Sequence, residues 1–479
     1  MTHLSVLAVV LPLLCAFLMP LLDMVSNRVN RAAVVLFATG QIVVLLLLIP
    51  QVAADGTVEY HLGGWGPRIG IVLVVDGFSL LFALLVAVGI WMVSLFSLDY
   101  VDRREYRYFV LLFIVLAGVT GMVLTGDLFN LYVFFELASL ASFPLIAFAK
   151  NPGAVEAAFR YMLYSTIASV FILLAIGLTY GATGTLNLRQ AAEVLSSADA
   201  TVRSAVLGLL LVGFAIKVAI VPFHAWLPEA HGSAPAPVSA LLSGVLLKTG
   251  VYAMVRLLLT FGPGVGLGRL EHILLNLGAL SVIVGHSLAV GQTNVKKMLA
   301  FSSIAHIGII VTGVGLGTVY GLAGALFHAI NHLFMKATAF FAAGRFGAGR
   351  GFEMADLRGA GWQAPWAAAA FIVSALSLIG LPPLAGFIGK WEITLDALRH
   401  GHLFHAAAIL LGTLLSAVYY GRVTRILFSK TGQNGPPEKS GGLFAGLALC
   451  AGVAGCFVQF LVWGRIEPIL IHIAGLIRG

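Results

Sequence analysis

Long apolar runs separated by short polar segments make up most of the chain, and they indicate helices that cross a membrane. Runs such as VLGLLLVGFAI at 206–216 contain no polar residue. Membrane-spanning β-strands alternate apolar and polar residues over about ten positions, so these runs do not fit a barrel. A window of about 19 residues predicts fourteen transmembrane helices. We expect them at about 4–22, 32–50, 71–97, 108–125, 128–149, 161–181, 204–222, 236–260, 271–290, 298–316, 319–344, 366–389, 402–428 and 442–464.

The composition agrees with an all-α polytopic membrane protein. Of the 479 residues, 60% are hydrophobic and 10% are charged, whereas a soluble domain carries about 25% charged residues. This excludes a soluble enzyme, a disordered chain and a nucleic-acid binder, despite the net charge of +8. We predict a single integral membrane domain over 1–479. Cys15, Cys450 and Cys456 lie in apolar runs without metal-ligand spacing, so we expect no disulfide, metal site or cofactor.

The loop charges predict an orientation. With the N-terminus outside, the inner loops hold sixteen basic residues and the outer segments hold seven, as the positive-inside rule requires. Fourteen helices then leave both termini outside. The inner set is Arg28, Arg31, Arg103, Arg104, Arg107, Lys150, Arg160, Lys296, Lys297, Arg345, Arg350, Arg358, Arg422, Arg425, Lys430 and Lys439. The outer set is Arg68, Arg189, Arg203, Arg269, Arg399, Arg465 and Arg478. The longest loops, near 182–203 and 345–365, are expected to be simple connections.

Five basic residues remain inside the predicted helices or at a helix break. Arg256 is near the outer end of its helix and can reach the interface. The other four are Lys217, Lys248, Lys336 and Lys390. A lysine at mid-bilayer costs about 2.5–3.5 kcal/mol, so these four should face protein or a water-filled cavity. A buried lysine can exchange protons near neutral pH. The alternative is that they anchor helices by pairing with carboxylates.

Glu136 is the candidate acidic partner in mid-helix. It lies in LFNLYVFFELASLASFPLIAF among aromatic residues, and we pair it with Lys217 as a coupled couple. Asp127, at the start of the same run, is expected to be a boundary charge. Asp76 is expected to be an interfacial residue or a cap.

Two of the predicted helices are interrupted. Pro222 follows Lys217 by five residues, and Pro382 and Pro383 precede Lys390. Proline removes a backbone hydrogen bond, and broken helices at membrane depth occur where they line a cavity or are buried in protein. The breaks fall in the seventh and twelfth spans. This predicts two inverted five-helix repeats, spans 4–8 (about 108–260) and 9–13 (about 271–428), flanked by spans 1–3 and 14. Ordinary proline kinks are the alternative.

Histidines add titratable groups to the eleventh span. His328, His332 and Lys336 are spaced i, i+4, i+8 and share one helical face, which favours a proton relay over a structural polar seam. Zinc is disfavoured because HAINH lacks the glutamate of a zincin motif and no third ligand is evident. His306 and His286 are as consistent with satisfied core histidines. His224 and Glu229 flank the first break, either at the mouth of a hydrated passage or in a plain loop.

Four stretches resemble the antiporter-like membrane subunits of respiratory complex I and its relatives. They are KVAIVPFHAWLPEAHGSAPAPVSALLSG, KKMLAFSSIAHIG, HAINHLFMKA and GLPPLAGFIGKW. The resemblance covers nearly the whole chain and implies fourteen helices with helices 7 and 12 broken. Within that superfamily, YHLGGWGPRIGIVLVVDGFSLL and the chain length are most similar to the D subunit of Mrp multi-subunit Na⁺/H⁺ antiporters.

The resemblance implies a proton pathway at matching positions. These are Glu136 of the fifth helix, Lys217 of the seventh, Lys248 of the eighth, His328 and His332 of the eleventh, Lys390 of the twelfth, and Lys336, which is similar to a residue that is often basic in the family.

The function we expect is that of a proton-translocating subunit in a multi-subunit Na⁺ or K⁺/proton antiporter. Its partners are other membrane subunits, and its location is the bacterial plasma membrane. It is a transporter subunit, not an enzyme. The alternative is the proton-pumping subunit of a complex I-type NADH:quinone oxidoreductase or a membrane-bound hydrogenase. The same residues serve either driving force, so the sequence leaves the two open.

Overall fold

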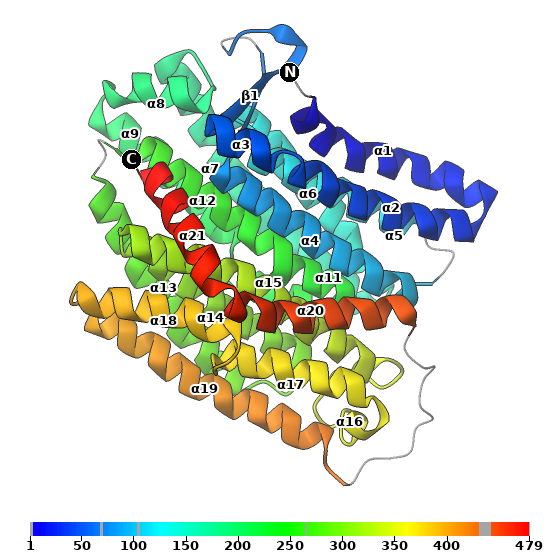
Figure 1. Cartoon of the computed structure of the whole chain (residues 1–479). Coiled ribbons are helices and arrows are strands. Elements are labelled where there is room, and N and C mark those ends of the chain that lie inside the picture. The colour runs from blue at the N-terminus through cyan, green and yellow to red at the C-terminus, as the bar shows by residue number, and fades with distance from the viewer. Residues whose placement is uncertain (1–2, 68–69, 103–105, 264–265, 431–441, 479) are drawn as a thin grey trace.

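The computed structural model describes residues 3–67, 70–102, 106–263, 266–430 and 442–478. It is a bundle of long helices that run in nearly the same direction or its opposite (Figure 1). Within these residues, twelve helices are long and apolar enough to cross a membrane. Both ends of the chain lie at the same end of the bundle (Figure 1). Arg68, Arg103, Arg104 and Lys439, which entered the charge count, fall outside the described ranges.

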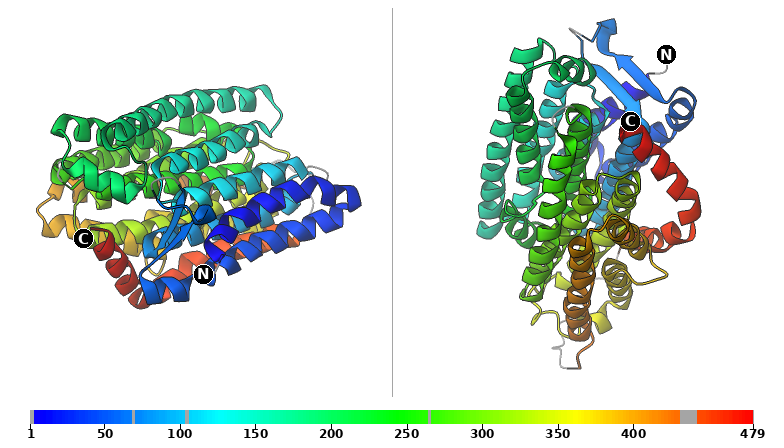
Figure 2. Two further views of the ribbon diagram at one scale, coloured as in Figure 1. Left: turned by 90° about the horizontal axis from the view of Figure 1, so that it is seen from above. Right: turned by 90° about the vertical axis from the view of Figure 1, so that its left-hand side faces the viewer.

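The first part of the chain contains helices at the edge of the bundle and one small sheet. Its elements are α1 (Leu4–Val25), α2 (Asn27–Leu46), α3 (Ile49–Asp55), β1 (Thr57–His61), η1 (Leu62–Gly64), β2 (Val72–Asp76) and α4 (Gly77–Tyr100). Figure 2 shows α1 and α2 at the periphery. They expose apolar side chains such as Phe17 and Leu36, as expected of a surface that faces lipid.

The hairpin of β1 and β2 differs from the predicted third span, which began at 71. Residues 72–76 pair antiparallel with 57–61, and the helix begins only at Gly77. The segment VLVVD is rich in β-branched valine, which favours a strand. Asp76 ends that strand and starts the helix with a capping box, in which it accepts from the Ser79 N–H and the Ser79 side chain accepts from the Asp76 N–H.

The middle of the chain contains the first interruption. Its elements are α5 (Tyr106–Leu124), α6 (Leu128–Ala147), α7 (Pro152–Thr183), α8 (Leu188–Ser196), α9 (Ala200–Lys217), α10 (Trp226–Ser233), α11 (Ala236–Leu241), the π-helical turn η2 (Leu242–Leu246) and α12 (Leu247–Phe261). The break after α9 begins at Lys217 itself, earlier than the predicted kink at Pro222. The loop near 182–203 is not a simple connection, since it contains the amphipathic helix α8.

The second half contains the longest buried helix and the second interruption. Its elements are α13 (Leu267–Val290), α14 (Val295–Gly315), α15 (Val319–Gly347), α16 (Ala360–Gln363), α17 (Pro365–Ile379), α18 (Ala385–Arg399) and α19 (Leu403–Leu427). α15 packs against α11, α14, α17, α18 and α20, so it lies at the centre of the molecule. Neither α15 nor the pair α17 and α18 is among the twelve apolar helices.

The chain ends in α20 (Leu443–Leu461) and α21 (Trp463–Arg478). The predicted final span corresponds to α20, but α21 was not expected from the apolar pattern. It has an apolar and a polar face, and it packs on α15 and α4. Its Arg478 forms an ion pair with Glu271 of α13, with 2.9 Å between Nη1 and Oε1. This contact attaches the C-terminal helix to the second half of the bundle.

Candidate functional site

Lys217 is the last residue of α9 and is held by hydroxyl groups of two neighbouring helices. Its Nζ donates to Ser139 Oγ of α6 at 2.8 Å and to Ser165 Oγ of α7 at 2.6 Å. The ammonium also lies 4.2 Å from the centre of the Phe135 ring, a distance at which an aromatic face attracts a cation. The position is buried, so the helix end delivers an amino group into the protein interior.

Glu136 lies near Lys217 but does not form an ion pair with it. Its carboxylate accepts a hydrogen bond from Ser169 Oγ, one helical turn along α7 from Ser165. The Ser169 hydroxyl also donates to the Ser165 carbonyl at 2.9 Å. The expected couple is therefore not in direct contact. The Glu136 carboxylate binds Ser169, the Lys217 amine binds Ser165, and the two serines are linked by the hydrogen bond from the Ser169 hydroxyl to the Ser165 carbonyl. Direct contact is lost because the Lys217 side chain ends between the serines of α6 and α7.

The backbone freed at the first break is satisfied by groups from elsewhere. The Trp226 indole donates to the Ile216 carbonyl at 2.9 Å, and the Val221 N–H, next to Pro222, donates to Ser281 Oγ at 3.1 Å. An irregular segment at membrane depth needs such partners because lipid offers none. Of the residues that flank the break, Glu229 forms an ion pair with Lys297 at 2.8 Å.

Lys248 lies at the centre of the molecule, directly after the π-helical turn. It is fully buried. Its Nζ donates to the Ser243 carbonyl and contacts His332 Nδ1 at 2.5 Å. The turn shifts backbone pairing by one residue, since the Leu247 N–H bonds to the Leu242 carbonyl instead of that of Ser243. Such turns occur often at functional sites, and this one presents a carbonyl to the lysine.

Three histidines from two helices form a buried stack beside Lys248. His306 of α14 lies between the two histidines of α15, with ring centres 5.2 Å from His328 and 5.0 Å from His332. His306 Nδ1 and His328 Nε2 are 3.0 Å apart. His286 of α13 adds a fourth ring 6.0 Å from His306 and contacts the Tyr419 hydroxyl at 3.1 Å. The sequence left His306 and His286 undecided; the structure brings His306 to the predicted pair and His286 to His306.

Lys336 lies on the same face of α15, one turn beyond His332, and is also fully buried. Its Nζ donates to the Leu299 carbonyl of α14 at 2.9 Å and to the Tyr420 hydroxyl of α19 at 3.4 Å. Tyr420 in turn shares a hydrogen bond of 2.9 Å with Ser302. The predicted i, i+4, i+8 series therefore forms one surface that faces α14, and Lys336 also reaches α19.

Lys390 lies one turn into α18, after the second break, and binds the end of the helix before it. Its Nζ donates to the carbonyls of Leu378 and Ile379 at 2.8 and 3.0 Å. Carbonyls at a helix C-terminus carry partial negative charge, which favours a cation there. The break contains Pro382 and Pro383 between Gly380 and α18. Gly389, beside Lys390, allows α18 to contact His328, since a Cβ there would lie 2.8 Å from His328 Nδ1.

The buried lysines share one property. Within the described ranges, Lys217, Lys248, Lys336 and Lys390 make no contact with a carboxylate within 4.0 Å, and their acceptors are hydroxyls, carbonyls and an imidazole.

A fifth lysine, Lys296 of α14, has the same character: it is buried and donates to the Ala234 carbonyl. The charge count had assigned Lys296 to an inner loop. The helix begins at Val295, because Asn294 caps it by accepting from the N–H groups of Lys296 and Lys297.

A family of membrane proteins matches this arrangement of residues. Residues 125–416 match the family described as "NADH:quinone oxidoreductase/Mrp antiporter, TM". The chain belongs to this family. The match contains α6 to α15 and both broken helices, and with them each lysine and histidine described above.

Relatives of this antiporter-like chain come from both kinds of complex. It is 35% identical to the N subunit of the NADH-quinone oxidoreductase of Desulforudis audaxviator, over 89% of this chain and 87% of the relative. It is 31% identical to the D subunit of the Na(+)/H(+) antiporter of Alkalihalophilus pseudofirmus, over 85% of this chain and 84% of the relative.

Solved structures of multi-subunit membrane complexes contain chains of the same fold. A chain of the archaeal membrane-bound sulfane sulfur reductase matches with a TM-score of 0.92 and 30% identity, covering 100% of this chain and 98% of that chain. A chain of the Mrp complex from Dietzia sp. DQ12-45-1b matches with a TM-score of 0.92 and 26% identity, with the same coverage. This antiporter-like protein is thus a membrane subunit similar to chains that sit among other membrane subunits.

Proposed function

We propose that the protein is the proton-translocating subunit of a multi-subunit antiporter that exchanges Na⁺ or K⁺ for protons. Protons enter near Glu136 and Lys217, cross the centre through Lys248 and the histidines, and leave near Lys390. Because the pathway is buried, a proton moves directly from one side chain to the next. Each transfer breaks one N–H or O–H bond and forms another.

The observation that carries this proposal is the unbroken series of titratable contacts at the centre. Lys248 touches His332, His332 stacks on His306, and His306 contacts His328. His328 then lies against Gly389, the neighbour of Lys390. Several buried ammonium groups without carboxylates repel one another, so adding a proton at one site favours its release from the next. Purely structural anchors would pair each lysine with an acid.

The proposed architecture has fourteen membrane helices. α15 and the broken pair α17 and α18 join the twelve apolar helices, and their polar residues face the proton pathway. Two inverted five-helix repeats run from α5 to α12 and from α13 to α19. Both termini lie outside the cytoplasm, in agreement with their shared end of the bundle (Figure 1) and with the loop charges.

A cysteine at the exposed position 358 should then be labelled only from the cytoplasmic side of oriented vesicles. Labelling from the outside would reverse the orientation.

A second candidate function is proton pumping in a redox-driven complex. It is favoured by the identity to the N subunit of an NADH-quinone oxidoreductase and by the fold match to the sulfane sulfur reductase. The same buried series would move protons there, with the energy supplied by electron transfer in other subunits. Purification of the intact complex separates the two: small antiporter subunits support the first function, and flavin or iron–sulfur proteins support the second.

Substitutions at the serine-bridged pair test proton transport directly. We expect Glu136→Ala and Lys217→Ala each to abolish proton-driven cation exchange while the complex still assembles, because the remaining group can change its protonation instead of staying as an unpaired charge. Glu136→Asp should keep some activity, since the carboxylate remains. Exchange is measured in vesicles from a strain that lacks its own antiporters, and assembly by co-purification of the other subunits.

Asp127→Asn is the matched control. Asp127 starts the same helix, α6, by accepting from the Asn130 N–H at 2.7 Å, and asparagine caps a helix about as well as aspartate. Among the described residues Asp127 forms no ion pair, so removing its charge should be mild. Near-normal exchange in both alanine variants would remove the pair from the mechanism.

A further inference from the structure

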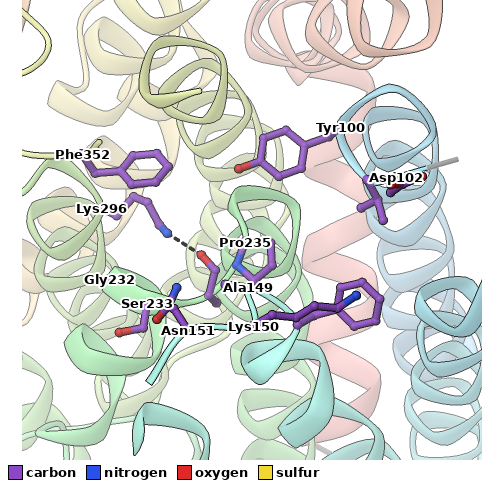
Figure 3. Close-up of a pocket in the computed structure, with 13 residues that line it drawn as sticks. Tyr100, Asp102, Ala149, Lys150, Asn151, Gly232, Ser233, Pro235, Lys296 and Phe352 are labelled. Carbon is purple, nitrogen blue, oxygen red and sulfur yellow. Dashed lines mark hydrogen bonds between the residues drawn. The ribbon is translucent and has the colours of Figure 1, made fainter. Parts of the chain in front are cut away.

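A cavity of about 550 Å³ opens at the end of the bundle opposite the chain termini. It lies between the end of α4, the loop from α6 to α7, the segment from α10 to α11, and the segment after α15 (Figure 3). Its walls include Tyr100, Asp102, Lys150, Ser233 and Lys296. A space of this size, with polar side chains among its walls, is large enough to hold water. By the orientation proposed above, this end faces the cytoplasm.

Lys296 lines this cavity although only 1% of its surface is exposed. Its amino group points toward the chain before Pro235 and donates to the Ala234 carbonyl (Figure 3). On its other side, Nζ lies 4.2 Å from the centre of the Phe352 ring. No carboxylate of the described residues lies within ion-pair distance. Its neighbour Lys297 is one-third exposed and pairs with Glu229. Consecutive lysines thus have opposite surroundings.

Behind Lys296 lies a histidine without a polar partner. His231 of α10 is fully buried, and neither ring nitrogen has a hydrogen-bond partner within the described ranges. The ring stacks on Phe340 of α15, with centres 4.9 Å apart. α10 packs against α14, the helix that carries Lys296, and Phe340 lies one turn from Lys336 on α15. His231 therefore adjoins both the helix of the cavity lysine and the helix of a central lysine.

One face of α14 connects the cavity to the histidine stack. Lys296, Leu299, Ser303 and His306 follow the spacing i, i+3, i+7, i+10, which keeps them on one side of the helix. The Leu299 carbonyl accepts from Lys336, Ser303 shares a hydrogen bond of 2.7 Å with Ser243, and His306 contacts His328. Ten residues of helix span about 15 Å, so this face reaches from the cavity to the centre of the molecule.

We propose that Lys296 loads protons from the cavity into the buried pathway, with His231 as the next carrier toward Lys248 and Lys336. A hydronium ion in the water of the cavity gives a proton to the neutral Lys296 amine, so that one O–H bond is replaced by an N–H bond and neutral water remains. The ammonium then passes a proton to a free His231 nitrogen, which delivers it to a central lysine and returns to its neutral form. This inference rests on the proposed proton transport and adds a second entrance, at the cavity, to the one near Glu136 and Lys217.

The alternative is a purely structural role, in which Lys296 only fixes the end of α10 by binding the carbonyl of Ala234, the residue that follows the helix. Substitutions separate the two roles. Arginine keeps a charged donor that can bind the Ala234 carbonyl and the Phe352 ring, but it does not release its proton. Histidine has fewer N–H donors than the lysine ammonium, but it gains and loses a proton near neutral pH. Proton loading therefore predicts that Lys296→Arg fails and Lys296→His partly recovers, whereas a structural role predicts the reverse order.

The experiment measures cation exchange per assembled complex in inverted vesicles. We expect Lys296→Met and Lys296→Arg to lower the rate at least about tenfold, a modest loss for a group that transfers protons, and Lys296→His to exceed both. The control is Lys297→Met, which removes an exposed ion pair and should change the rate less than about twofold. Normal exchange in the Met or Arg variant overturns the proposal.

A second measurement avoids any effect on folding. In a chain with Cys15, Cys450 and Cys456 replaced by serine, Ser233→Cys adds a single thiol to the cavity wall. We expect a membrane-impermeant thiol reagent, applied after assembly from the cytoplasmic side, to block exchange. Unchanged exchange after complete labelling overturns the cavity as the uptake route. If Glu136 and Lys217 variants are inactive while the Lys296 variants and the blocked cavity are normal, only this inference fails. If all are normal, the proposed function fails as well.

Discussion

Two cations on the same helix, the buried Lys248 and the partly buried Arg256 of α12, have contrasting environments. Arg256 forms an ion pair with Asp76 at 2.8 Å, bonds to the Tyr252 hydroxyl at 3.2 Å and lies over the Phe78 ring. The sequence suggested that it would only reach the interface. Lys248, eight residues earlier, has no carboxylate within the described ranges and binds a carbonyl and an imidazole.

The difference follows from the chemistry of the two side chains. A guanidinium does not lose its proton in a protein, so a buried arginine needs a carboxylate to remain in place. A lysine can lose its proton when water is removed, so neutral acceptors are enough. The two ends of α12 therefore differ in chemistry: the Arg256 end holds a permanent charge pair, and the proposed function requires the Lys248 end to change its charge during transport.

Replacing Lys248 by the other cation of this comparison, arginine, is the most stringent test of the difference between the two positions. We expect Lys248→Arg to lower exchange by about a hundredfold or more, the range of lost proton transfer, because arginine keeps its proton. Lys248→Met removes the group without adding volume and should give the same loss. Exchange is measured in vesicles, per assembled complex.

Arg256→Lys is the reciprocal variant. Lysine can still pair with Asp76, although it gives up the paired hydrogen bonds of the guanidinium, so exchange should stay within about threefold of wild type by that argument. Equal losses in Lys248→Arg and Arg256→Lys would show that both ends of α12 serve the same role, and the comparison would not hold.

A smaller loss is expected where α18 contacts the histidine stack. In Gly389→Ala, the added Cβ would lie 2.8 Å from His328 Nδ1 and 3.0 Å from the His328 Cα. Overpacking of this kind costs about 1–3 kcal/mol, and it also displaces His328 relative to Lys390. We expect exchange to fall several-fold and the melting temperature of the complex to drop. Gly446→Ala of α20 meets nothing within 4 Å, so it should leave both unchanged.

The smallest effect on transport is expected at the paired end of α12. Asp76→Asn leaves Arg256 without its carboxylate, which should destabilise the complex by about 1.5–3 kcal/mol, the range for hydrogen bonds to charged groups. Exchange per assembled complex should be normal. A loss of exchange in fully assembled Asp76→Asn complexes would extend the proton pathway to this end of α12.

The stability effect of Asp76 should depend on pH. Burial raises the pKa of this carboxyl, but the Arg256 charge and its hydrogen bonds outweigh burial, so the pKa lies below the usual value. A group with a lowered folded-state pKa stabilises the protein above the unfolded pKa of about 3.9, and that contribution is lost as the pH falls. The difference in melting temperature between wild type and Asp76→Asn should therefore shrink toward acidic pH.

Much of the fold follows from local sequence properties. The apolar runs mark most of the helices that the structure contains, since the cost of burying polar groups in lipid acts on each segment separately. Prolines at 222 and 382–383 mark both interruptions for the same reason. The hairpin of residues 57–76 and the helix α21 were missed, because a strand depends on its distant partner and an amphipathic helix has no continuous apolar run.

The sequence by itself determined that this protein lies in a membrane and which lysines are expensive to bury there. Only the tertiary structure decided what each lysine touches. Ser165 is 52 residues from Lys217, and His332 is 84 residues from Lys248, so no local pattern could identify these partners. For the same reason, Lys296 resembled a loop charge beside Lys297. Its burial is set by Ala234 and Phe352, which the fold brings to it from other segments.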